Sequence, residues 1–125
     1  MNTQRHEVPD DPTLVLDAES GKWIRPQFTR AIVYPDGRVV KRLAPIPRNE
    51  IEALICDPAP HAPRSLTVVN LRDGHVMFVH DMGAVVEPKL PINRGASAAY
   101  LALCKPDTDW LIRGVVVVVP DSDFA

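Results

Sequence analysis

The run Val115-Val116-Val117-Val118-Val119 is the longest β-branched stretch of the chain, and it decides the fold. Valine is β-branched, and its side chain packs well on the pleated surface of a sheet. A strand with one wet face alternates apolar and polar residues, whereas this run is apolar on both faces. We therefore expect a long strand over residues 109–119 that lies at the centre of the sheet and ends at Pro120.

Two β-hairpins are expected beside this strand. Residues 31–43 combine β-branched and aromatic residues with a Pro-Asp-Gly turn at 35–37, in which proline fixes φ and glycine supplies a positive φ. Residues 66–80 are mainly apolar around an Asp-Gly pair at 73–74, which is typical of tight hairpin turns. Residues 84–87 predict a further short strand.

Two short helices are expected between these strands. The first spans residues 47–56, where apolar residues recur at the i, i+3, i+4 spacing of a helix face. The second begins at Asn93, whose side-chain oxygen can cap the first turn, and ends before Pro106. Together these elements predict an α+β fold, with a mixed, mostly antiparallel sheet of about five strands and both helices on one face.

The N-terminal 21 residues differ in charge from the rest of the chain. Residues 1–21 hold one basic and five acidic residues, whereas residues 22–64 hold eight basic and four acidic residues. Residues 13–17 and 22–25 are expected to pair as a small hairpin. We expect residues 1–21 to form an acidic, partly disordered arm and residues 22–125 to form a single α+β domain.

The composition excludes several classes of protein. The 125 residues carry a formal net charge of −2, which excludes a basic protein that coats polyanions. No apolar stretch approaches the ~18 residues that cross a bilayer, and the N-terminus lacks the apolar core of a secretory signal. Cys56 and Cys104 lie far apart among apolar neighbours and are expected to be buried free thiols. These features predict a cytoplasmic protein with no membrane partner.

The chain lacks the common catalytic motifs. It contains no Gly-x-Ser-x-Gly nucleophile turn, no glycine-rich phosphate loop, and no Cys-x-x-Cys or His-Glu-x-x-His pattern. We therefore assign no catalytic residue, no metal ligand and no cofactor. Whether the protein is an enzyme stays open, and the absence of motifs favours a non-catalytic role.

Four residues are candidates for a ligand site: His80, Asp81, Asn93 and Arg94. His80 and Asp81 stand at the end of a predicted strand, and Asn93 and Arg94 stand at the start of a predicted helix. Arg94 in the first turn opposes the helix dipole, which favours either a salt bridge with Asp81 or Glu87 or contact with a small anionic ligand. The structural alternatives are a strand-end histidine, a helix cap and a surface ion pair.

The first predicted hairpin is also basic, and aromatic residues are interleaved with its charges, as in platforms that bind single-stranded nucleic acid. The candidate residues are Arg30, Arg38, Lys41 and Arg42. Aromatic residues make up only 6% of the chain, which argues against an extended stacking surface. Charges on an edge strand also protect it from aggregation, so nucleic acid is a possible but not a favoured partner.

The second half of the chain resembles a known family. Over residues 65–119 it combines the turn His80-Asp81-Met82-Gly83, the motif Leu90-Pro91-Ile92-Asn93-Arg94, a small-residue helix start at 95–96 and a Gly-Val-Val strand at 114–118. This order resembles small proteins encoded by phages, plasmids and their hosts, catalogued as domain of unknown function 3846. The resemblance implies an accessory protein of a mobile element and implies no activity, substrate or cofactor.

The expected function is non-catalytic. We expect an accessory protein of a phage or mobile element that binds a host or defence protein or sequesters a small ligand. One alternative is a small enzyme acting on a phosphorylated small molecule at residues 80–81 and 93–94. Another is a nucleic-acid binder that uses the basic hairpin at residues 30–43. The β-rich build is also compatible with a homodimer.

Overall fold

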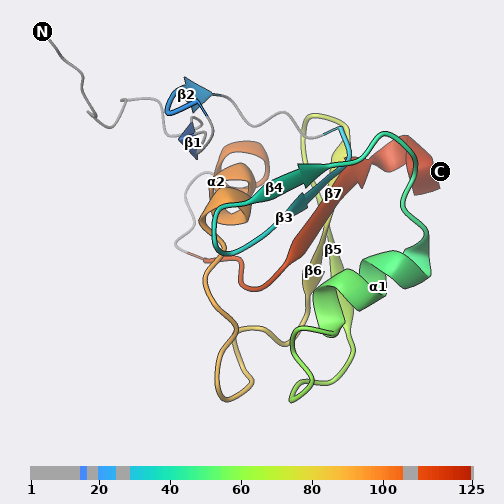
Figure 1. Ribbon diagram of the computed structural model, residues 1–125, viewed down its shortest axis with the longest axis vertical. Coiled ribbons are helices and arrows are strands. Elements are labelled where there is room, and N and C mark those ends of the chain that lie inside the picture. Colours follow the sequence, from blue (N-terminus) through green and yellow to red (C-terminus); the bar gives the residue numbers. More distant parts are fainter. Residues whose placement is uncertain (1–14, 17–19, 25–28, 106–109, 125) are drawn as a thin grey trace, which may run out of the picture.

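A five-stranded antiparallel sheet with one helix on each face forms the body of the protein (Figure 1). The computed structural model describes residues 15–16, 20–24, 29–105 and 110–124. The strands are β3 (Ala31–Val33), β4 (Val39–Lys41), β5 (Leu66–Asn70), β6 (His75–His80) and β7 (Val116–Pro120). The helices are α1 (Arg48–Cys56), α2 (Arg94–Leu103) and the 3-10 turn η1 (Asp121–Phe124). The predicted α+β class is confirmed, and all four pairings of this sheet are antiparallel.

The valine run forms the central strand, as predicted. The strand order is β4-β3-β7-β6-β5, and residues 116–119 of β7 are fully buried. The strand is shorter than expected because Gly114 has a φ of +83°, which interrupts the extended backbone. Residues 110–115 precede the strand, and Arg113 makes only an isolated bridge with Ile92. Pro120 is the last residue of the strand.

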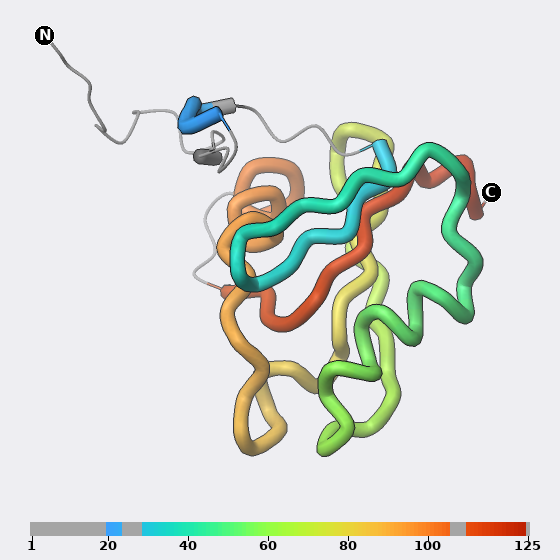
Figure 2. Tube along the Cα trace, viewed as in Figure 1, coloured from blue at the N-terminus to red at the C-terminus, as the bar shows by residue number. Residues whose placement is uncertain are grey.

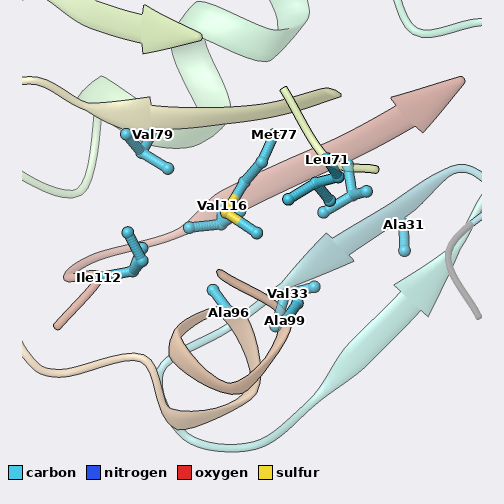
Figure 3. Close-up of a cluster of buried hydrophobic side chains, with 10 residues drawn as sticks. Ala31, Val33, Leu71, Met77, Val79, Ala96, Ala99, Ile112 and Val116 are labelled. Atoms are coloured by element: carbon cyan, nitrogen blue, oxygen red, sulfur yellow. The ribbon is translucent and has the colours of Figure 1, made fainter. Parts of the chain in front are cut away.

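The helices lie on opposite faces of the sheet, so the expectation that both cover one face is wrong. The side chains of Val117 and Val119 pack under α1, and those of Val116 and Val118 pack under α2. A central strand that is apolar on both faces needs a cover on each side. The α2 contact uses small residues, and Figure 3 shows Ala96 and Ala99 of this helix beside Met77 and Val116.

Both predicted turns are present, with Gly37 at φ +98° and Gly74 at φ +85°. The short strand expected at residues 84–87 is wrong. There the amides of Val85 and Val86 both donate to the Met82 carbonyl oxygen, so the backbone forms consecutive turns and residues 84–87 pair with no strand of the described chain. Val85 is exposed, whereas Val86 packs against Ala59, Ala62 and Leu90, so this segment contacts the loop after α1 and not a neighbouring strand.

The predicted N-terminal hairpin is confirmed where it is described. Strands β1 (Val15–Leu16) and β2 (Trp23–Ile24) pair antiparallel as a separate two-stranded sheet. The predicted disorder of the acidic arm concerns residues 1–14 and 17–19, which lie outside the described residues. Cys56 and Cys104 are free thiols as expected, although Cys104 is only partly buried. In the described segments, no helix has the length and apolar character to cross a membrane.

Two loops meet at one end of the sheet and shape the region after β6. Figure 2 shows the loop that follows α1 beside the loop at residues 81–91. His61 Nε2 lies 2.9 Å from the carbonyl oxygen of Pro88, which joins the two loops. The second loop closes on itself because the Leu90 amide donates to the Gly83 carbonyl oxygen.

Candidate functional site

A cavity of about 190 Å³ lies where the ends of β5 and β6 approach α2 and residues 110–113. Val69, Val79 and Ile112 line it with aliphatic side chains that also belong to the core under α2. Figure 3 shows Val79 and Ile112 at the same end of that core. Tyr100 of α2 and Trp110 add aromatic surface. Apolar walls of this kind favour binding of a ligand with an apolar body.

Asp81 supplies a negative charge at this cavity. Its carboxylate accepts hydrogen bonds from the Ser65 hydroxyl, at 3.2 Å, and from the Thr67 hydroxyl. Its backbone amide donates to the Ser65 carbonyl oxygen at 2.9 Å. The hydroxyls of β5 and its approach therefore orient an exposed carboxylate that directly follows β6.

Arg113 supplies a positive charge at the same cavity, and the sequence analysis missed it. Its Nη1 donates to the Leu90 carbonyl oxygen at 3.0 Å, and its backbone pairs with Ile92. Its Cβ lies only 3.4 Å from the position that a Cβ on Gly83 would occupy. Within the described residues, Arg113 forms no ion pair. The available signal was that Arg113 is the one charged residue among residues 110–119.

His80 holds the turn that carries Asp81. It is 5% exposed, and its Nδ1 accepts a hydrogen bond from the Met82 amide at 3.0 Å, so a neutral ring carries its proton on Nε2. Alternation along β6 places His80 on the face opposite Val79. Burial lowers the pKa of His80, the nearby charge of Asp81 raises it, and His61 lowers it further. His80 is thus a positioning residue, not the partly exposed strand-end residue that was expected.

Asn93 is a structural cap, as one of the two interpretations predicted. It is fully buried, and its Oδ1 accepts from the Ala96 amide at 3.1 Å. Its Nδ2 donates to the carbonyl oxygens of Val33, at 2.9 Å, and Gly114, at 2.8 Å. The side chain joins α2, β3 and the approach to β7, and its burial leaves no surface for a ligand.

Arg94 is not among the residues that line the cavity. Its side chain is exposed, and it has no hydrogen-bond or ion-pair partner among the residues that the structure describes. The predicted salt bridge with Asp81 or Glu87 is not formed there. Of the four candidate residues, the structure therefore brings only His80 and Asp81 to the cavity.

The basic hairpin is largely neutralised by carboxylates. Arg30 makes two hydrogen bonds of 2.8 Å with Asp123, which lowers the pKa of that carboxyl. Arg38 pairs with Asp36 at 3.0 Å and stacks 4.2 Å above the ring of Tyr34. Of the four candidates, only Lys41 has no ion pair in the described part of the chain, because Arg42 pairs with Glu50. A nucleic-acid phosphate would have to displace a carboxylate from each of the three arginines.

A second cavity, of about 280 Å³, lies between the β3–β4 turn and the loop after α1. Its walls include Ile55, Leu90 and Val115. Asp36 and Arg38 are its charged residues, and they pair with each other. Because these two charges neutralise each other, they do not indicate a charged group on a ligand, whereas Asp81 and Arg113 at the first cavity do.

No family model, curated protein or solved structure matches the chain. The function is therefore argued from the geometry of the site. The resemblance to domain of unknown function 3846 stays a prediction. No group of three His, Cys, Asp or Glu residues within the described segments is placed to hold a metal ion. Burial raises the pKa of the Cys56 thiol, which disfavours the reactive thiolate.

Proposed function

We propose that the protein is a non-catalytic binding protein that sequesters a small ligand in the cavity beside Asp81 and Arg113. One observation carries the proposal: opposite charges that do not pair with each other line one cavity with apolar and aromatic walls. Few convergent polar groups on an apolar cavity are typical of ligand sites. The resemblance adds a context, an accessory protein of a phage or mobile element, and the two free cysteines favour a location in the cytoplasm.

The size of the cavity favours a small metabolite over a large cofactor. Its volume of about 190 Å³ is below the ~300–1,000 Å³ of common drug-sized sites. A ligand of this size would contact both the apolar walls and the two charged residues that line the same cavity. A host or defence protein is the alternative partner, and it requires no occupied cavity.

Binding is favoured over catalysis because the nearest titratable base is already engaged. The Nδ1 of His80 accepts the Met82 amide, and burial keeps the ring neutral and away from solvent. A general base needs a free acceptor within hydrogen-bond reach of the reacting proton. The carboxylate of Asp81, which also lines the cavity, already accepts hydrogen bonds from the Ser65 and Thr67 hydroxyls.

The test is an amide NMR titration of the full chain with a mixture of common amino acids, amines, organic acids and nucleosides. We expect shifts that map to Thr67, Asp81–Gly83 and residues 111–113 and that are absent in Arg113→Met. Arg94→Met is the matched control, because this exposed arginine does not line the cavity, and it should leave the shifts unchanged. Shifts confined to the 280 Å³ cavity would contradict the assignment.

A further inference from the structure

We infer that the ligand is a compact zwitterion with an apolar or aromatic body, the chemical class of the larger apolar amino acids. The inference rests on the proposed function and names the chemistry of the same cavity. It follows from charge balance. A ligand with only an anionic group would satisfy Arg113 and be repelled by Asp81, and a ligand with only a cationic group would meet the reverse.

Asp81 is arranged to receive a cation. Its two oxygens offer about four acceptor positions, and the hydroxyls of Ser65 and Thr67 use two of them. These hydroxyls fix the carboxylate without neutralising its charge. The remaining acceptor positions suit an ammonium group, which has three donors and no acceptor.

Arg113 is arranged to receive an anion. One of its five N–H donors is occupied by the Leu90 carbonyl oxygen, which holds the guanidinium in place. The other donors form the planar fork that binds a carboxylate through two parallel hydrogen bonds. No carboxylate within the described segments competes for this fork.

The other walls of the cavity suit an uncharged body. Val69, Val79 and Ile112 offer aliphatic surface, and Tyr100 offers an aromatic ring. Contact with these walls removes apolar ligand surface from water, at roughly 25 cal/mol per Å². Asp81 and Arg113 then set which end of the ligand faces each of them.

The experiment compares three compounds that share one body. Phenylalanine carries both charges, phenethylamine carries only the ammonium, and 3-phenylpropanoate carries only the carboxylate. Calorimetric titration of the full chain should show phenylalanine binding about tenfold tighter than either analogue, as expected for each lost charge-assisted hydrogen bond. A second series built on leucine, isopentylamine and 4-methylpentanoate tests an aliphatic body.

Two variants assign each charge to its residue. Asp81→Asn should abolish the preference for phenylalanine over 3-phenylpropanoate, and Arg113→Met should abolish its preference over phenethylamine. Arg94→Met should retain both preferences. Circular dichroism melting of each variant confirms that it is folded, and Arg113→Lys, which keeps the charge, should bind the zwitterion more weakly than the wild type and more tightly than Arg113→Met.

The outcomes separate this inference from the proposed function. Equal binding of phenylalanine and 3-phenylpropanoate would contradict the zwitterion and leave the binding function intact. The same holds if only compounds of another chemical class shift the amide signals of the cavity residues. If no compound of either series binds and the NMR mixture shifts no cavity amide, both the zwitterion and the proposed function are wrong.

Discussion

The Nδ2 of Asn93 donates a 2.8 Å hydrogen bond to the carbonyl oxygen of Gly114. This bond joins the start of α2 to the segment just before the central strand β7. The same amide nitrogen reaches the Val33 carbonyl oxygen in β3. One buried side chain thus fixes three elements. Arg113, the cation of the candidate site, is the neighbour of Gly114, so its position depends on this junction.

Asn93→Ala should destabilise the fold by about 3 kcal/mol or more, because it removes a helix cap and the amide that donates to two carbonyl oxygens, those of Val33 and Gly114. Urea unfolding measures the change. Asn49→Ala is the matched control, since Asn49 is an exposed residue of α1, and its effect should be within about 0.5 kcal/mol. Similar losses for both variants would contradict the role of Asn93.

Gly114→Ala should be more damaging than Gly37→Ala, although both glycines have a positive φ. A Cβ at Gly114 would lie 3.0 Å from Leu90 Cδ1, whereas a Cβ at Gly37 has no heavy atom within 4 Å. The Gly37 variant should lose about 1 kcal/mol from backbone strain alone, and the Gly114 variant should lose more. Equal melting temperatures would show that the contact with Leu90 has no cost.

Acidification should weaken the fold through His80. Burial lowers the pKa of His80 in the folded state, so below the ordinary value of about 6.5 the unfolded chain binds a proton that the folded chain does not. The free energy of unfolding should therefore decrease as the pH falls from about 6.5 towards the lowered pKa. His80→Asn should remove this decrease, whereas His61→Asn, which changes an exposed histidine, should retain most of it.

The Arg30–Asp123 pair should contribute stability at neutral pH that disappears in acid. The hydrogen bond from Arg30 lowers the pKa of Asp123, so the folded state binds the proton later than the unfolded state as the pH falls. The contribution is complete above the ordinary carboxyl value of about 3.9 and is lost as the pH falls through the lowered pKa. Asp123→Asn should therefore be less stable than the wild type at pH 7. The difference should narrow below about pH 4, and a difference that is constant with pH would contradict the ion pair.

Local sequence patterns predicted the parts of the fold that depend on local chemistry. The valine run indicated a central strand because both of its faces are apolar, and Asp-Gly pairs marked two turns with glycine at positive φ. Asn93 was identified as a cap because its side chain acts on an amide only three residues away. The same valine pattern also implies that each face of the sheet needs a cover, although both helices were predicted to lie on one face.

The candidate site could not be predicted in full because its contacts join distant parts of the chain. Arg113 depends on the Leu90 carbonyl oxygen, 23 residues away, and Asp81 depends on hydroxyls at 14 and 16 residues' separation. Arg30 meets its carboxylate across 93 residues. The sequence alone does not indicate which charges are paired. The arginines of the hairpin form ion pairs, whereas Arg113 at the cavity forms none with the described residues, and this difference distinguishes the two candidate sites.

The most direct test of the account is native mass spectrometry of the protein as purified from its expression host, without refolding, beside Arg113→Met and Arg94→Met. The same spectra report whether the chain is a monomer or a homodimer. We predict an added mass of a small molecule on the wild type and on Arg94→Met, and its loss from Arg113→Met. Two results would contradict a ligand site at Arg113. One is that all three proteins carry no added mass under conditions that preserve a weak complex with added phenylalanine. The other is that Arg113→Met retains the added mass.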